Sequence, residues 1–485
     1  MEPRPMYGRI PIYTDVSEIT AENIFSVIAE AWPIHQKNRA DIQYLWDYYR
    51  GKQPILERVK TERPDILNKI VVNRAYEIVS FKSSYIIGDP IQYINRSDSD
   101  NVTSDLVQLN DYMYMAGKHG VDKEIIDWLH ICGTAYRLVL PENGRSEDEP
   151  PFSVNSLDPR GTFVVYHRGI GNRPVLGVTY TVHSDNSVTI SAYSRNRYYE
   201  IDYGSGLVVE TPVPPLSGIR IDEGHLCGDI PIIEYPANKA RLGAFEPVLT
   251  LLDAINLECS DRVDAVEQFI QALLVLEGVD IEGEQFTRLK EYGGLCIPAG
   301  SKAYYLTQEL NQSQTQTLVD WMDQTILILC GMPNRNGGSS TSDTGAAVYL
   351  RDGYDAANLR AKDTEDIFDI SEDKFLRIAL RIIKTMRGLD IRPSAIKPQF
   401  TRKNYDNTQT KAQVLTTMLA NDKIDPRLAF EYCGMFIDAE AAYKMSAAYY
   451  ERVREREAAS LRAYTEAETE RARAEAEEDG ETETA

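Results

Sequence analysis

Residues 334–345 read Asn-Arg-Asn-Gly-Gly-Ser-Ser-Thr-Ser-Asp-Thr-Gly and separate two segments that have helical patterns. The first segment, residues 315–332, ends in Gly-Met followed by Pro333, and glycine and proline are typical of helix ends. The second, residues 346–387, begins just after a Ser-Asp-Thr run, whose residue types cap helices well. Because most connections between helices are only a few residues long, this stretch is either a slack surface loop or a moving functional part.

The composition limits the classes of protein to consider. With 485 residues the chain exceeds what one hydrophobic core usually serves, so we expect several substructures. No run of about 18 or more apolar residues occurs, so we expect no membrane span. The net charge of −22 argues against tight, non-specific DNA binding by the whole surface, but it leaves open contact with DNA that slides without sticking. The six cysteines are scattered and never form Cys-x-x-Cys, which favours free thiols over a zinc site.

Apolar residues recur at three- and four-residue steps in several stretches, which predicts helices. These stretches are residues 17–50, 68–88, 104–132 (two helices broken near Gly117 and Gly120), 246–278, 315–332, 346–387 (with a kink at Gly353) and 407–457. Between residues 134 and 235 the period changes to two, which predicts strands at 135–140, 162–166, 177–182 and 187–190. Short strands are also expected at 91–94 and within 391–400. The sequence therefore predicts a mainly helical α+β protein with a small, mostly antiparallel sheet region.

The helix expected at residues 246–278 has one apolar seam and an acidic polar face. At 1.5 Å per residue it would be about 50 Å long. Its face carries Glu246, Asp253, Glu258, Asp261, Asp264 and Glu267, against a single cation, Arg262. A narrow seam with an outer face of one sign suits packing against copies of itself or a partner helix. The alternative is an ordinary solvated helix face.

Residues 279–311 form a compact insertion between this helix and the helix that leads to the 334–345 loop. They predict a short helix at 285–292 and strands at 295–298 and 303–306. The insertion therefore lies at the tip of a helical hairpin, a place where contacts to other molecules are common. At the other end of the chain, residues 463–485 are acidic and poor in apolar residues, so we expect them to fray or be disordered.

The sequence lacks the common catalytic and nucleotide-binding motifs. There is no Gly-x-x-x-x-Gly-Lys-Ser/Thr phosphate loop, no Gly-x-Ser-x-Gly and no His-Glu-x-x-His. Residues 169–174 begin like a dinucleotide fingerprint but have Pro174 where its last glycine is needed. We therefore expect neither an enzyme nor a bound cofactor or metal.

The order of the parts resembles the portal proteins of tailed double-stranded DNA bacteriophages, in the branch seen in siphophages of Gram-positive hosts. The likeness spans roughly residues 40–455 and rests on short motifs in a given order. They are Asn-Lys-Ile-Val-Val-Asn at 68–73 leading to Ser-Tyr-Ile-Ile-Gly-Asp-Pro-Ile at 84–91, Ile-Pro-Ile-Ile-Glu-Tyr at 230–235, Phe-Glu-Pro-Val at 245–248, Leu-Asp-Ala-Ile-Asn at 252–256, Ser-Asp-Thr-Gly-Ala-Ala at 342–347, Phe-Thr-Arg-Lys-Asn at 400–404 and Lys-Ala-Gln at 411–413.

The resemblance implies a division of the chain into named regions. They are a wing (1–242, with a return segment at 346–404), a stem of two helices (243–279 and 312–333), a clip (280–311), a tunnel loop (334–345), a crown (405–460) and an acidic tail (461–485). It also implies a dodecameric ring at one capsid vertex of the virion, assembled in the host cytoplasm, through which viral DNA is packaged and ejected. The implied partners are copies of the chain, double-stranded DNA, the terminase large subunit, major capsid and scaffolding proteins, and a head-completion or adaptor protein; no membrane is implied.

The resemblance assigns three groups of site residues. The channel loop comprises Asn334, Arg335, Asn336, Gly337, Gly338, Ser339, Ser340, Thr341, Ser342 and Asp343. The acidic stem face comprises Asp253, Glu258, Asp261, Asp264 and Glu267, and the docking residues of the clip are Glu284, Arg288, Lys290, Glu291 and Lys302. Arg335 is the one cation of the loop and is expected to touch phosphates transiently; the alternative is an ordinary solvent-facing residue. Two other functions stay open, a capsid-associated adaptor without a DNA conduit and an enzyme acting on phage DNA.

Overall fold

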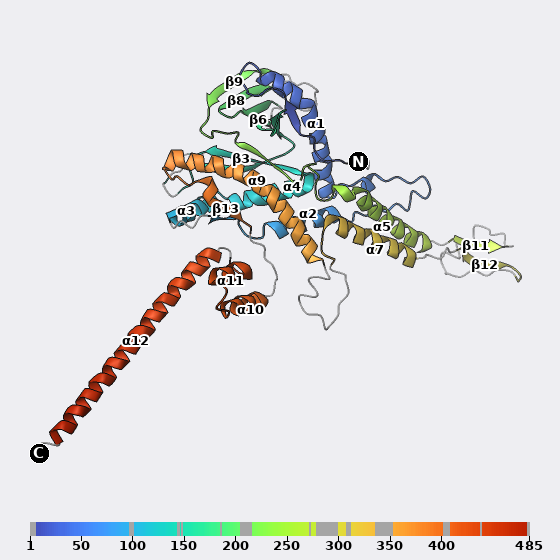
Figure 1. Ribbon diagram of the computed structural model, residues 1–485. Coiled ribbons are helices and arrows are strands. Elements are labelled where there is room, and N and C mark those ends of the chain that lie inside the picture. The colour runs from blue at the N-terminus through green and yellow to red at the C-terminus, as the bar shows by residue number, and fades with distance from the viewer. Residues whose placement is uncertain are drawn as a thin grey trace. The chain divides into compact units, whose positions relative to one another are not determined.

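The computed structural model describes residues 6–96, 101–142, 146, 149–184, 187–203, 216–270, 273–277, 299–306, 312–334, 353–400, 408–436 and 439–482. The chain divides into two compact units, Met1–Arg402 and Lys403–Ala485, whose elements Figure 1 labels. The fold is mixed α+β and mainly helical, as the sequence predicts.

A six-stranded sheet in the first unit has the order β1-β5-β6-β7-β8-β9. Its strands are β1 (Ile12–Thr14), β5 (Thr162–His167), β6 (Pro174–Val182), β7 (Val188–Tyr193), β8 (Arg197–Tyr203) and β9 (Leu216–Gly224). Only β1 pairs in parallel, with β5, so the sheet is mostly antiparallel as expected. Helix α1 (Ile24–Tyr49) covers one face, where its Trp32 packs in a common core with Phe163 and Ile190 of the sheet.

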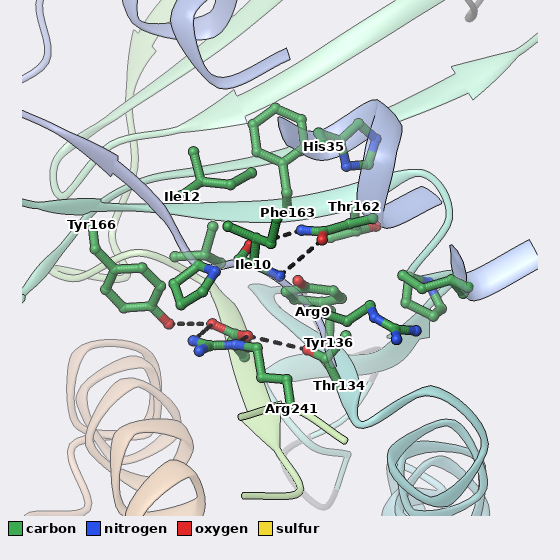
Figure 2. Close-up of a pocket in the computed structure, with 16 residues that line it drawn as sticks. Arg9, Ile10, Ile12, His35, Thr134, Tyr136, Thr162, Phe163, Tyr166 and Arg241 are labelled. Carbon is green, nitrogen blue, oxygen red and sulfur yellow. Dashed lines mark hydrogen bonds and ion pairs between the residues drawn. The ribbon is translucent and has the colours of Figure 1, made fainter. Parts of the chain in front are cut away.

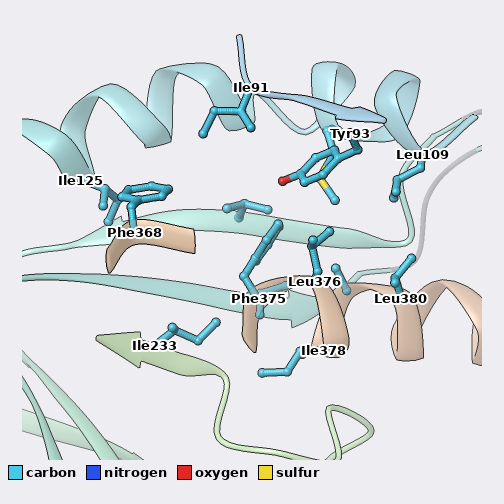
Figure 3. Close-up of a cluster of buried hydrophobic side chains, with 14 of the residues drawn as sticks. Ile91, Tyr93, Leu109, Ile125, Ile233, Phe368, Phe375, Leu376, Ile378 and Leu380 are labelled. Atoms are coloured by element: carbon cyan, nitrogen blue, oxygen red, sulfur yellow. The ribbon is translucent and has the colours of Figure 1, made fainter. Parts of the chain in front are cut away.

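A second, three-stranded sheet has the order β10-β3-β4, from β10 (Ile232–Pro236), β3 (Thr134–Pro141) and β4 (Phe152–Leu157). It shares the largest core of the molecule with helices α3 (Asn101–Met115), α4 (Lys118–Cys132) and α9 (Tyr354–Arg387). Figure 3 shows part of this core, in which Phe375 and Leu376 of α9 lie beside the strands of the sheet and Tyr93 lies above them in the view. Tyr93 belongs to β2 (Gln92–Asn95), which pairs antiparallel with β13 (Ile396–Gln399).

Four charged side chains lie inside this core and pair completely with one another. Arg137 of β3 binds Asp122 of α4, and its Nη1 lies 2.7 Å from Oε2 of Glu372 on α9. Lys118 Nζ lies 2.7 Å from Asp122 and 2.9 Å from Glu372. Two cations therefore balance two carboxylates, which avoids the high free-energy cost of an unpaired buried charge. Burial alone would raise the pKa of Glu372, but Arg137 and Lys118 outweigh it and hold that pKa below its usual value.

The helical hairpin consists of α5 (Leu249–Ile270), preceded by a 3-10 turn at Glu246–Val248, and α7 (Gln312–Cys330). The expected helix over 246–278 therefore ends earlier, and its last apolar residues belong to strand β11 (Leu273–Glu277), paired antiparallel with β12 (Lys302–Leu306). A Leu-Leu-Val-Leu run fits a buried helix as well as a strand, so periodicity could not place this end. The clip helix at 285–292 and the strand at 295–298 lie outside the described residues.

Two expected helices begin later than the pattern predicts, and the first of them, α1, begins at Ile24 rather than at residue 17. Helix α2 is Arg74–Ile86, not 68–88, because residues 68–73 contact α5 through their backbone. Helix α9 begins at Tyr354, directly after Gly353, which adopts the left-handed region with φ of 80°. The part of the expected helix at residues 346–352 lies outside the described residues, so the expected kink at Gly353 stays a prediction. The predicted break at Gly117 between α3 and α4 is confirmed, whereas Gly120 lies within α4. The remaining short helical turns are Pro54–Glu57 and Pro393–Ala395.

The second unit contains α10 (Thr408–Leu419), α11 (Pro426–Cys433) and α12 (Ala439–Thr482). Among the residues of this unit whose burial the structure describes, the buried apolar side chains are Ala429, Phe430 and Cys433. The expectation that residues 463–485 fray or are disordered is wrong up to Thr482, which ends α12. The stretch is rich in Ala, Glu and Arg, and their high helix propensity accounts for a helix without an apolar face.

Candidate functional site

The hairpin of α5 and α7 is the region to which the sequence assigns function, and an apolar seam closes it. Leu252 and Ile255 of α5 share a core with Val319, Met322 and Ile326 of α7. Near the tip, Nη1 of Arg262 donates to Oε1 of Gln316 at 2.8 Å. The predicted seam of α5 is therefore buried in its first half, but Val263 and Val266 further along it are about 40% exposed.

Residues 53–73, which we call the strap, run along α5 and bind it through a ladder of hydrogen bonds. The backbone N–H groups of Asn68, Ile70 and Val72 donate to side chains of α5 at 2.8, 2.9 and 2.7 Å. Their acceptors are Asp264, Ser260 and Asn256, all buried. Four residues of helix rise about 6 Å and two residues of extended chain span about 6.6 Å, so alternate N–H groups meet every fourth residue of the helix.

The strap also neutralises part of the predicted acidic face. Asp264 lies 2.6 Å from Lys60 and 3.3 Å from Arg58, and Arg58 also pairs with Asp261. Nδ2 of Asn68 donates to Glu267 at 2.9 Å. Burial disfavours the charged form of Asp264, but the hydrogen bonds from Lys60 and Asn68 outweigh it and lower its pKa. Three of the five predicted acids are therefore in contact with the strap, a feature that helical periodicity could not reveal.

The other acidic residues of α5 differ from one another in environment. Asp253 accepts a hydrogen bond from the hydroxyl of Tyr48 at 2.9 Å, and burial raises its pKa. Glu258 is partly buried. Glu246, which the pattern placed on the polar face, is 4% exposed and pairs with Arg9. This part of the expectation is wrong because Glu246 precedes the helix, where its carboxylate also accepts the N–H of Gly243.

Little of the predicted channel loop can be placed. Asn334 lines a pocket of about 470 Å³ between α2 and α7, together with Phe81, Asp323 and Met332. In the wall of this pocket Arg74 binds Asp323 through two nitrogens, at 3.2 and 2.8 Å. The other loop residues lie outside the described residues: Arg335, Asn336, Gly337, Gly338, Ser339, Ser340, Thr341, Ser342 and Asp343.

Of the segment predicted as the clip, residues 280–311, the structure describes residues 299–306, which include β12. Lys302 is exposed at the start of β12 and lies opposite Glu277 of β11. Glu284, Arg288, Lys290 and Glu291 lie outside the described residues.

A polar junction joins the two sheets and the N-terminal segment of the first unit (Figure 2). Arg241 donates to both oxygens of Glu234 at 2.6 and 3.1 Å, while Thr134 and Tyr166 donate to the same carboxylate. Burial would raise the pKa of Glu234, but Arg241 outweighs it and lowers that pKa. The cavity beside it, about 10 Å³, has room for about one water and none for an organic ligand. We regard this junction as structural.

The described part of the chain contains no cluster of three or more His, Cys, Asp or Glu side chains arranged to hold a metal ion. The described cysteines (132, 227, 259, 330 and 433) are free thiols, as predicted. Of the helices the structure describes, none has both the length and the apolar character needed to cross a bilayer.

Comparison with protein families gives a match that covers both units. Residues 28–482 match the family described as "Phage portal protein, SPP1 Gp6-like". The chain belongs to this family. The match confirms the resemblance to phage portal proteins, and portal membership implies a place in the virion capsid. A comparison with curated proteins finds no match. Assignment of this portal protein to the branch of Gram-positive hosts stays a prediction.

Proposed function

We propose that copies of this portal protein form a dodecameric ring at one capsid vertex, around a channel through which double-stranded DNA is packaged and ejected. The observation that carries the proposal is the family match over residues 28–482, which includes the stem, clip and crown segments. The hairpin supports it: α5 and α7 form a paired stem, and the strap ties α5 to the wing by at least three buried acceptors.

The channel residues we propose follow from the chain path around the hairpin. Helix α7 leads into the segment that begins at Asn334, and α9 begins after Gly353. We propose that residues 334–343 line the narrowest part of the channel and that Arg335 touches DNA phosphates transiently. A single cation per chain gives weak, reversible contact, which suits DNA that must move.

The clip residues Glu284, Arg288, Lys290, Glu291 and Lys302 are proposed to dock the terminase large subunit and, later, a head-completion or adaptor protein. The remaining proposed partners are the major capsid and scaffolding proteins. Their surfaces are not assigned to residues. The role is structural rather than enzymatic, because catalysis of packaging would reside in the docked motor.

The first test is negative-stain imaging of the purified full chain, combined with mass determination. Rings with a central hole and about twelve subunits are expected, in line with closed cyclic assemblies. A monodisperse monomer or dimer at high protein concentration would contradict self-assembly into a channel and would favour an adaptor without a conduit.

The second test addresses the loop. Arg335→Ala should change DNA retention or packaging velocity in a packaging assay with assembled capsids, and Ile170→Ala, at an exposed turn of the first unit, should leave both unchanged. An Arg335→Ala variant that packages and retains DNA like the unmodified protein would remove Arg335 from the mechanism.

A further inference from the structure

Helix α7 is apolar on two sides, of which one is buried within the part of the chain that the structure describes. Val319, Met322, Ile326 and Cys330 are buried against α5 and neighbouring residues. A second row is exposed: Leu318 (43%), Trp321 (57%), Ile328 (72%) and Leu329 (48%). We call these four residues the outer row.

Within the outer row, Trp321 and Ile328 face away from the core of their own chain, whereas Leu318 and Leu329 lie about 100° from Val319 and Cys330 of the buried row. Each residue turns a helix by about 100°, so Ile328, two residues from both Ile326 and Cys330, points about 200° away from them. Leu318, Trp321, Thr325 and Ile328 follow the 3-4-3 spacing of a helix-packing seam. Thr325 fits this row because its hydroxyl donates to the carbonyl of Trp321 at 2.8 Å, which satisfies the polar group within the helix.

Single exposed apolar residues are ordinary on protein surfaces, but a continuous row is not. From Leu318 to Leu329 the row extends about 16 Å along the helix. A helix that is apolar on most of its circumference is normally buried. A continuous apolar row of this kind is typical of a surface that another molecule covers.

We propose that the outer row of α7 packs against α5 of a second copy of this chain, on the face that carries Leu257. This inference rests on the ring proposed above and identifies the contact that closes it. Leu257 is 45% exposed and lies two residues from both Ile255 and Cys259, which belong to the seam toward α7. It therefore points about 200° away from that seam, to the side of the hairpin opposite the outer row.

The heights of the two surfaces along the hairpin agree. Arg262 of α5 and Gln316 of α7 are hydrogen-bonded, so they lie at one level. The helices are antiparallel, and Leu257 and Trp321 are each five residues from that level in the same direction. A rotation about a ring axis parallel to the hairpin would bring Trp321 of one copy against Leu257 of the next without a vertical shift.

Such a contact is heterologous, because two different faces of the chain meet. Contacts of this kind repeat from copy to copy and close into a ring when the rotation permits. The chain carries the outer row on one side of the hairpin and Leu257 on the opposite side, so every copy supplies both halves of the contact. This favours a second copy over an unrelated protein as the partner.

The test uses the full chain and a charge exchange across the contact. Trp321→Lys and Leu257→Glu should each abolish rings in negative-stain images and shift the mass to small species. The double variant should restore rings, because each contact then joins Lys to Glu. Ile170→Glu is the matched control: Ile170 is fully exposed at the turn between β5 and β6, and rings should persist.

The outcomes separate this inference from the proposed function. Rings from the unmodified chain that survive Trp321→Lys would overturn the contact while leaving the ring intact. Loss of rings in both single variants without rescue in the double variant would show that Leu257 is not the residue that Trp321 contacts. Far-UV circular dichroism of each variant should match the unmodified chain, and a loss of helical signal in Trp321→Lys would show a structural role within one chain instead. Absence of rings in the unmodified chain would count against the proposed function itself.

Discussion

Asp264 illustrates how one carboxylate joins two parts of this molecule. It accepts hydrogen bonds from the backbone and side chain of Asn68 and from Lys60, and it pairs with Arg58. The sequence showed its charge and its place on α5 but not its partners, because they lie about 200 residues earlier in the chain. Residue types and helical spacing predict which face a side chain occupies, whereas contacts between distant segments depend on tertiary structure.

Asp264→Ala should lower the free energy of unfolding by about 2–4 kcal/mol, because it removes the acceptor of the Asn68 N–H and the carboxylate that pairs with Lys60, while Arg58 keeps its pair with Asp261. Asp264→Asn keeps an acceptor for the N–H of Asn68 and should lower the free energy of unfolding by less than Asp264→Ala does. Denaturant unfolding followed by circular dichroism measures both. Glu258→Ala, on the same helix, should change stability by no more than about 0.5 kcal/mol. Equal losses at the two positions would argue against the strap contact.

His130 gives the fold a defined response to acid. It is buried, its Nδ1 lies 3.3 Å from the Ser83 hydroxyl, and burial followed by the charge of Lys82 lowers its pKa to about 3. The unfolded chain takes up this proton near pH 6.5, so stability is full above that value and falls as pH drops from about 6.5 toward 3.

Within that pH window, one such histidine makes the free energy of unfolding fall by about 1.4 kcal/mol for each pH unit of acidification. His130→Gln should therefore flatten the dependence of the unfolding free energy on pH by up to that slope between pH 6 and 4. Urea unfolding at several pH values measures it. His35, also lowered to about 3 by burial and the charge of Arg39, remains in the variant, so a smaller slope persists. An unchanged slope would mean that His130 is protonated in the folded state.

At the scale of elements, the sequence predicted the type of the long elements better than their ends. The helices that became α4, α7 and α9 and the strands β3, β5, β6 and β7 were predicted in place. Residues 68–73 were predicted as helix because Ile70 and Val71 fit a helical seam, yet Asn68, Ile70 and Val72 also alternate as an extended segment does. Which pattern applies depends on α5, whose Asn256, Ser260 and Asp264 supply the acceptors.

Helix α4 ends at a glycine whose replacement should be severe. Gly133 has φ of 78°, and an added Cβ would lie 2.0 Å from the carbonyl oxygen of Arg241. Gly133→Ala should cost more than about 4 kcal/mol or prevent folding, since the obstructing atom is backbone. Gly117 precedes the same helix with φ of 66°, but a Cβ there meets nothing within 4 Å. Gly117→Ala should cost only about 1–2 kcal/mol of backbone strain, and thermal unfolding of the two variants compares them. Similar midpoints would contradict the close approach at Gly133.

At the scale of the whole molecule, the surfaces that one chain leaves exposed are the ones that can contact other molecules. The strap covers three acids of α5, so the stem is less acidic on that side than its sequence indicates. The described part of the chain leaves the outer row of α7 exposed. The sequence contained these residues, but only the fold showed that Val319 and Ile326 are buried while Trp321 and Ile328 are exposed. Of the predicted site, the structure placed the acids of α5, Asn334 and Lys302, and it supplied the strap, which no motif indicated.

The two units should respond separately to heat because their cores are separate. The first contains the four clusters around the sheets and the hairpin, whereas the buried apolar residues that the structure describes in the second are Ala429, Phe430 and Cys433. A core this small gives little stabilisation, so we expect the second unit to melt first.

Scanning calorimetry of the full chain should then show two transitions. Phe430→Ala should lower the midpoint temperature of only the first transition, because Phe430 stacks on Phe436 and contacts Tyr443 edge to face. Phe375→Ala should lower only the second by removing a fully buried ring, and each change should cost about 3–5 kcal/mol in its own unit. If either variant moved both transitions together, the units would be energetically coupled, and the crown would have to be treated as part of the same cooperative structure as the stem.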